Sequence, residues 1–253
     1  MNRSPIWLLI DGNNHVHRDY HAAGVGRVGP VFSARIDNMI ARWSPERVMV
    51  AFDCGRCFRH DIAQDYKAGR ERPADIDEAI EVAKDVAIGH AADVLSVGGF
   101  EADDVIATWT RIAVEAGARV LISSSDKDLH QLIRKGVVCQ LTKFSRSYGG
   151  VSAEFINRDR LLECFGVTPE QWVEFRMLTG DPSDNISGIA GFGPKTAATL
   201  LRDCGSIERF FRLPFSTGIS ERLKNRLRQS QDKLDELRSL LSLRNDVPLP
   251  ENW

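Results

Sequence analysis

Residues 94–123 read VLSVGGFEADDVIATWTRIAVEAGARVLIS. Two short runs rich in β-branched residues, VLSV and ARVLIS, flank a segment whose apolar residues recur at helical spacing. That segment ends at Gly117, a residue type that often terminates helices. A strand, a helix and a second strand in this order are typical of a mostly parallel sheet covered by helices.

The same alternation extends to both sides of this stretch. Residues 6–10, 47–52 and 137–141 read as further strands, and residues 76–91 read as a second helix. From about residue 152 onward the pattern becomes helical. Glycines at 24, 26 and 29 predict a flexible loop, and the polar, basic residues 55–75 predict a mobile or projecting segment.

Composition places the 253-residue chain among ordinary globular proteins, with 43% hydrophobic and 27% charged residues. The longest unbroken apolar runs hold about five residues, whereas a membrane helix needs about 20. The N-terminus shows no signal-peptide pattern, and five cysteines in a chain of this length are no disulfide framework. We therefore expect a soluble, cytoplasmic protein without membrane contact.

Acidic residues follow several of the predicted strands directly. They are Asp11, Asp53, Asp126 and Asp128. Because the carboxyl ends of parallel strands meet at one edge of a sheet, we expect these carboxylates to lie close together. Any one of them taken alone could equally be a solvated surface residue.

Three more acids, Glu101, Asp103 and Asp104, begin the helix within the opening stretch. A single acid there could simply favour the helix dipole. Three together repel one another unless a positive charge lies between them. Carboxylates without neighbouring His or Cys ligands favour Mg²⁺ or Mn²⁺, and two such ions can hydrolyse a phosphodiester bond.

Residues 188–199, GIAGFGPKTAAT, read as a hairpin between two helices. Gly191 and Gly193 would let backbone N–H groups approach a DNA phosphate, and Lys195 would add positive charge. An ordinary glycine turn between packed helices is the alternative. The preceding GDPSDNISG favours the DNA-binding interpretation, because it sets Asp181 and Asp184 beside the hairpin.

The net charge of −2 argues against a polyanion only at first sight. If bound cations neutralised the nine carboxylates named above, the net charge of −2 would become +7. Residues 201–230 also hold seven basic residues against three acidic ones. A basic surface around an acidic site suits a polyanion handled by metal ions.

At these motifs the sequence resembles the 5′-nuclease family, which includes phage-type flap endonucleases, the 5′–3′ exonuclease domain of bacterial DNA polymerase I and stand-alone relatives. The matching segments stand in family order: LLIDGNNHVHRDYHA, VAFDCGRCFRHDIAQDYKAGRERP, GGFEADDVIAT, SSSDKDLHQL and LTGDPSDNISGIAGFGPKTAATLL. The resemblance implies an α/β fold: a PIN-like, mostly parallel sheet with flanking helices over residues 1–180, with a helical arch near residues 60–92. A helical H3TH (helix–hairpin–helix) region would follow over residues 181–253.

The resemblance also implies roles for individual residues. In the family, the counterparts of Asp11, Asp53, Glu101 and Asp103 hold a first metal ion, those of Asp103, Asp126, Asp128 and Asp184 hold a second, and those of Asp104 and Asp181 are outer ligands. Counterparts of Tyr66, Lys67 and Arg70 lie against the scissile phosphate, where we expect Lys67 and Arg70 to stabilise the phosphate and Tyr66 to stack on a base. The counterpart of Arg18 lies near the substrate strand. Family members often bind K⁺ at hairpin carbonyls, which correspond here to Gly188, Ile189, Gly191 and Gly193.

The sequence thus predicts a monomeric, divalent-metal-dependent 5′–3′ exonuclease or 5′-flap endonuclease, acting on DNA in replication and repair. One alternative is a module that binds branched DNA without cleaving it. Another is a Toprim-type metal-dependent domain, which would use Glu101, Asp126 and Asp128 but leave four of the other carboxylates without a role. Phage or cellular origin, and the preference for DNA over RNA, are left open by the sequence.

Overall fold

The computed structural model describes residues 4–147, 150–213 and 217–250. Contacts divide the chain into two units, and each is described by itself. The first unit comprises the described parts of Met1–Cys57, Glu71–Asn157 and Leu243–Trp253, and the second comprises Phe58–Arg70 and Arg158–Ser242. None of the helices in the described ranges is long and apolar enough to cross a membrane.

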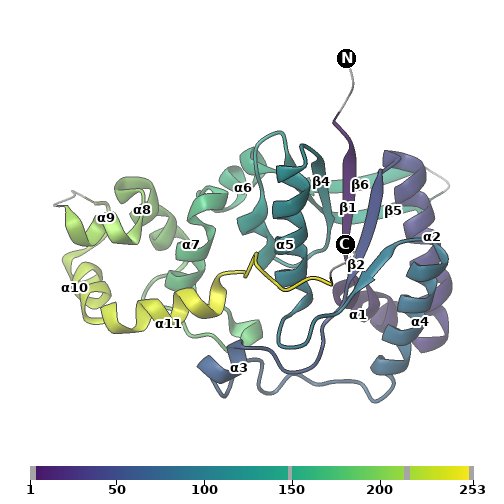
Figure 1. Ribbon diagram of the computed structural model, residues 1–253. Coiled ribbons are helices and arrows are strands. Elements are labelled where there is room, and N and C mark those ends of the chain that lie inside the picture. The colour runs from purple at the N-terminus through teal and green to yellow at the C-terminus, as the bar shows by residue number, and fades with distance from the viewer. Residues whose placement is uncertain (1–3, 148–149, 214–216, 251–253) are drawn as a thin grey trace. The chain divides into compact units, whose positions relative to one another are not determined.

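A six-stranded sheet with the order β3-β2-β1-β4-β5-β6 forms the middle of the first unit (Figure 1). The strands are β1 (Ile6–Asp11), β2 (Arg47–Ala51), β3 (Asp93–Leu95), β4 (Arg119–Ser123), β5 (Val138–Ser147) and β6 (Gly150–Ile156). All pairs among β1 to β5 are parallel, and β6 pairs with β5 in the antiparallel sense. The expected α/β class with a mostly parallel sheet is confirmed.

Helices cover both faces of this sheet. They are α1 (Gly12–Ala23), α2 (Val25–Trp43), α4 (Ile76–Gly89), α5 (Ala102–Glu115) and the 3₁₀ helix η1 (Asp128–Leu132). Successive side chains of β1 point to opposite faces of the sheet. Leu8 and Ile10 therefore pack with α1, α2 and α4, whereas Trp7 and Leu9 pack with α5 on the other face. The segment around Val247 packs on the same side as α5.

Two of the local expectations were wrong. The loop predicted at Gly24, Gly26 and Gly29 is reduced to Gly24, the N-cap of α2, and the other two glycines lie in the first turns of that helix. There Gly29 is buried, and a Cβ on it would lie 3.0 Å from Val82 of α4, so the small residue permits a close approach between the two helices. The helical pattern assigned from residue 152 begins as strand β6, because its residues complete a hairpin with β5 that short-range periodicity does not reveal.

The second unit is helical. Its α-helices are α3 (Arg59–Ile62), α6 (Arg158–Phe165), α7 (Trp172–Thr179), α8 (Pro194–Cys204), α9 (Ile207–Arg212), α10 (Glu221–Gln229) and α11 (Gln231–Leu241). Two 3₁₀ helices, η2 (Pro169–Gln171) and η3 (Pro182–Asp184), precede and follow α7. Arg59 of α3 is buried and donates to the carbonyls of Leu240 (2.8 Å) and Ser242 (3.1 Å), so residues 58–70 are fixed to the end of α11.

Candidate functional site

Asp11 lies at the carboxyl end of β1, where it also caps helix α1. Its Oδ1 accepts the backbone N–H of Asn14 at 2.9 Å, and its Oδ2 accepts the Ser124 hydroxyl at 2.7 Å. The residue is only 4% exposed. Strand, cap and hydroxyl therefore hold this carboxylate in one orientation.

The pKa of Asp11 reports what surrounds it. Burial raises this pKa to about 7, the hydrogen bonds from Asn14 and Ser124 oppose the rise, and the negative charges of Asp126 and Asp53 add to it. The carboxylates that follow β2 and β4 are thus close enough to Asp11 for their charges to act on it, as expected from their places at strand ends. An oxygen-rich site of this kind is stabilised by a divalent cation.

The start of α5 adds further carboxylates. Ala102 donates its backbone N–H to Asp53 Oδ1 at 2.8 Å, which ties the end of β2 to this helix. Glu101 and Asp104 form a capping box, and Asp103 lies between them, half-buried. Asp104 is fully buried, and its two oxygens accept the backbone N–H groups of Glu101 (3.2 Å) and Arg244 (2.9 Å). These contacts give Asp104 a structural role, and its role as an outer metal ligand stays a prediction.

A buried pair, Gln140 and His130, supports the loop that carries Asp126 and Asp128. Gln140 Nε2 donates to the carbonyls of Ser124 (2.9 Å) and Asp126 (2.6 Å). Its Oε1 must then accept from His130 Nδ1, which lies 2.7 Å away. No motif in the sequence indicates this pair, because His130 of η1 meets Gln140 only when β5 takes its place in the sheet.

A second buried network surrounds His15. Its Nδ1 accepts from Arg18 (2.6 Å) and Arg35 (3.0 Å), so Nε2 carries the proton and donates to the carbonyl of Ser123 (3.1 Å). Burial and then the charges of Arg35 and Arg18 hold the pKa of His15 well below its usual range. Asp19 balances the arginines, since it accepts two hydrogen bonds of 2.6 Å from Arg35. The network holds the partly exposed Arg18, whose predicted contact with substrate stays a prediction.

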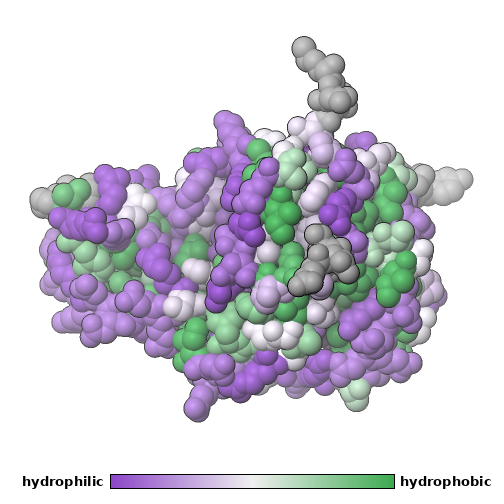
Figure 2. Space-filling model, in the orientation of Figure 1, coloured by the Kyte–Doolittle hydropathy of each residue, from purple (hydrophilic) through white to green (hydrophobic). Residues whose placement is uncertain are grey.

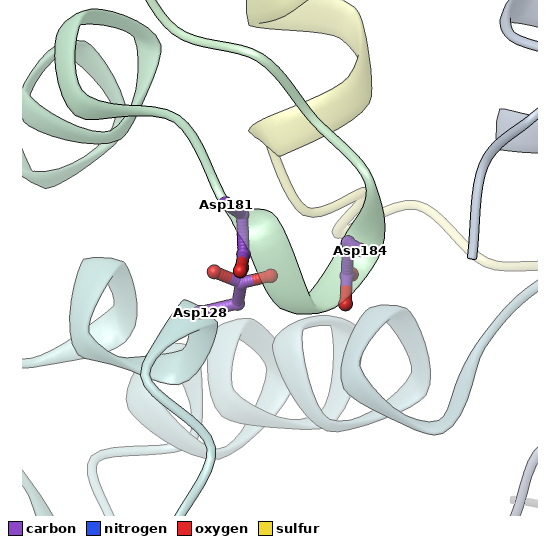
Figure 3. Close-up of side chains that lie close together, drawn as sticks. All are labelled: Asp128, Asp181 and Asp184. Carbon is purple, nitrogen blue, oxygen red and sulfur yellow. The ribbon is translucent and has the colours of Figure 1, made fainter. Parts of the chain in front are cut away.

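In the second unit, Asp181 and Asp184 lie at the two ends of η3 (Figure 3). Burial disfavours the charged form of Asp181, but hydrogen bonds from Ser183 and the charge of Arg176 outweigh it and lower the pKa of Asp181. Both aspartates are buried, at 7% and 5% exposure. Burying a carboxylate is costly unless it is hydrogen-bonded, and Ser183 and Arg176 supply hydrogen bonds to Asp181.

Tyr66, Lys67 and Arg70 gather around Asp184. The Tyr66 hydroxyl donates to Asp184 Oδ2 at 3.1 Å, Lys67 Nζ lies 3.9 Å from the same oxygen, and Arg70 donates to Oδ1. The structure thus brings together three residues that sequence reasoning placed beside a phosphate. Tyr66 is 5% exposed and meets His60 edge-on, so stacking of its ring on a base stays a prediction.

The glycine segment after η3 has the form of a hairpin leading into α8. Gly180 and Gly188 approach so closely that a Cβ on either would lie within 2.5 Å of the other's backbone nitrogen. Gly193 is the N-cap of α8 and Pro194 its first residue, as the sequence predicted. Lys195 is exposed at the start of that helix. Contact of Gly191, Gly193 and Lys195 with DNA stays a prediction.

Comparison with known families identifies the class of protein. Residues 6–166 match the N-terminal resolvase-like domain of the 5′-3′ exonucleases, and residues 167–253 match their C-terminal SAM fold. The chain belongs to the 5′-3′ exonuclease family, whose members are nucleases. Membership confirms the predicted family and enzyme class, and it leaves no reason to favour a Toprim-type domain.

Individual relatives agree with this assignment. The chain is 34% identical over 260 residues to a 5′-3′ exonuclease of Mycoplasmopsis pulmonis, covering 98% of this chain and 84% of that protein. It is 33% identical over 252 residues to DNA polymerase I of Bacillus caldotenax, covering 96% of this chain but only 28% of the polymerase. The fold is similar to that of phage T5 5′-exonuclease with bound zinc, with a TM-score of 0.78, 21% identity and coverage of 93% and 89%.

Proposed function

We propose that this chain is a divalent-metal-dependent, structure-specific 5′ nuclease that removes nucleotides from 5′ ends of DNA and cleaves 5′ flaps near their junction with duplex. The observation that carries the proposal is the group of carboxylates at the ends of β1, β2 and β4, where burial and then the negative charges of Asp126 and Asp53 raise the pKa of Asp11. A T5 flap endonuclease was crystallised with DNA and metal ions, and it has the same fold. Roles in DNA replication and repair follow from the family.

The donor set fits Mg²⁺ or Mn²⁺, because every candidate ligand offers carboxylate oxygen. We propose the carboxylates of the first unit as the main ligands: Asp11, Asp53, Glu101, Asp103, Asp126 and Asp128, with Asp104 as an outer ligand. We propose the same function for Asp181 and Asp184 of the second unit. When bound, such ions activate water and stabilise the charge that develops on the phosphate.

The chain's own residues would contribute in three further ways. Ser124, held by Gln140 and His130, keeps the Asp11 carboxylate oriented through its hydroxyl. Lys67 and Arg70 form ion pairs with Asp184 in this structure and would bind a DNA phosphate in its place, since guanidinium binds phosphate well. The hairpin at residues 188–193 would hold the backbone of downstream duplex without reading its sequence.

Cleavage of a labelled 5′-flap duplex tests this proposal. We expect metal-dependent cutting within about a nucleotide of the junction in Mg²⁺ or Mn²⁺, and none in EDTA. Asp126→Ala should abolish cleavage while flap binding persists, whereas Asp85→Ala, an exposed acid on α4, should cleave like the native chain. Tight binding without product in either metal would instead favour a non-catalytic module for branched DNA.

A further inference from the structure

Two cationic side chains of the second unit bind backbone carbonyls of the hairpin, residues 187–193. Arg226 of α10 donates from Nη1 to the carbonyl of Ala190 at 2.9 Å. Lys233 of α11 donates from Nζ to the carbonyl of Ser187 at 3.0 Å. The two helices thus carry positive charge to the loop that was expected to meet DNA.

These contacts bear on the expected potassium site at the hairpin carbonyls. Of the four predicted ligands, Ile189 accepts the N–H of Phe192 at 3.0 Å, and Gly193 accepts that of Ala197 at 3.0 Å. Arg226 lies against a third, since a Cβ on Gly191 would be 2.9 Å from its Nη1. A carbonyl oxygen can accept a second partner, but a guanidinium already at the loop repels another cation. The residues present therefore do not fit K⁺.

We propose that Arg226 is the hairpin's own cation and binds a phosphate of duplex DNA directly, so that DNA binding by this chain needs no potassium. The inference rests on the proposed function, in which the hairpin holds duplex. Guanidinium has five N–H donors, so an arginine that donates to one carbonyl can also donate to a phosphate. Gly191, at φ +89°, has no Cβ, and one there would lie 2.9 Å from Nη1 of Arg226, so the glycine is what admits the guanidinium to the loop.

The neighbours of Arg226 on α10 have other partners. Lys224 donates to Glu221 at 2.7 Å, and Arg228 donates to Asn225 at 2.9 Å and lies over the ring of Phe210. Figure 2 shows a largely hydrophilic surface over α10 and α11, as expected for helices that face solvent or a polyanion. Arg226 is half-buried and differs from Lys224 and Arg228 in its contact with the hairpin, not in its charge.

Fluorescence anisotropy of a labelled 5′-flap duplex in EDTA tests the inference in KCl, NaCl and tetramethylammonium chloride of equal ionic strength. We expect the native Kd to agree within twofold in all three salts. Arg226→Ala should weaken binding about tenfold in NaCl and tetramethylammonium chloride but less in KCl, because K⁺ can then occupy the vacated carbonyl. The Kd of Arg226→Lys should stay within threefold of the native value, because this variant keeps the positive charge. Its result distinguishes loss of the charge from a loss of folding.

Arg222→Ala is the matched control, since it removes an exposed arginine from the same helix. We expect it to weaken binding by threefold at most, equally in the three salts. Native binding at least fivefold tighter in KCl than in NaCl would overturn the inference and leave the proposed function standing. The inference would also be overturned if Arg226→Ala lost no more affinity than Arg222→Ala, or if KCl did not reduce the affinity lost in Arg226→Ala. Absence of binding by the native chain in every salt would overturn the proposed function as well.

Discussion

Removing the Asp19 carboxylate should lower the free energy of unfolding by about 3–5 kcal/mol. Asp19 is 3% exposed and accepts two hydrogen bonds of 2.6 Å from Arg35, whose side chain is 12% exposed. Hydrogen bonds to charged groups contribute roughly 1.5–3 kcal/mol each, so two of them give a loss of similar size. Asp19→Ala would also leave Arg35 and Arg18 facing each other beside His15 without a counter-charge.

Equilibrium urea denaturation of the metal-free chain, followed by tryptophan fluorescence, measures this loss. Glu81→Ala is the control, because its ion pair with Lys84 is on the surface and its own side chain is 69% exposed; the loss there should stay below about 0.5 kcal/mol. A double variant, Asp19→Ala with Arg35→Met, should cost at least about 2 kcal/mol less than the two single losses added together. A loss below about 1 kcal/mol for Asp19→Ala, or simple additivity in the cycle, would refute the interpretation of this network as a buried, mutually dependent pair.

Asp11→Asn should raise the free energy of unfolding of the metal-free chain at pH 8 by on the order of 4 kcal/mol. A folded pKa of about 7 against 3.8 means that ionisation increasingly destabilises the native fold as pH rises from 4 to 7, which urea denaturation at pH 5 and 8 in EDTA would show. Gln140→Leu should cost about 1–3 kcal/mol, since two carbonyls of the loop that carries Asp126 and Asp128 lose a buried donor, and should weaken Mn²⁺ binding measured by electron paramagnetic resonance. Gly180→Ala should cost about 2–4 kcal/mol in thermal unfolding, because a Cβ at φ +78° would lie 2.5 Å from the backbone nitrogen of the hairpin.

Each of these three expectations has an outcome that contradicts it. An Asp11→Asn variant no more stable than the native chain at pH 8 would mean that burial and the neighbouring charges do not disfavour the ionised Asp11 carboxylate in the metal-free state. Unchanged Mn²⁺ affinity in Gln140→Leu would limit that residue to a structural role. Gly98→Ala is the control for Gly180→Ala, because nothing lies within 4 Å of its Cβ position, and equal losses in the two variants would refute the argument from close approach.

The short-range pattern of the sequence was sufficient to predict the sheet and the covering helices of the first unit. The apolar residues of strands such as residues 6–10, and the acids that follow three of the strands, predicted both the parallel sheet and the edge at which its carboxylates gather. The pattern failed where a partner distant in sequence decides the local structure. Strand β6 exists because β5 offers it hydrogen bonds, and Gly29 is helical because α2 packs closely on α4.

The sequence by itself determined the fold class, the nuclease family and the residue types of the proposed metal centre, because all three depend on local periodicity and on motifs read along the chain. Only the tertiary structure decided which groups hold those residues in place. Gln140 meets His130 through strand pairing, and Arg226 meets Ala190 through helix packing. Hydrogen bonds and charges act over a few ångströms in space, whatever the distance along the chain, so these partners are fixed only when the chain is folded.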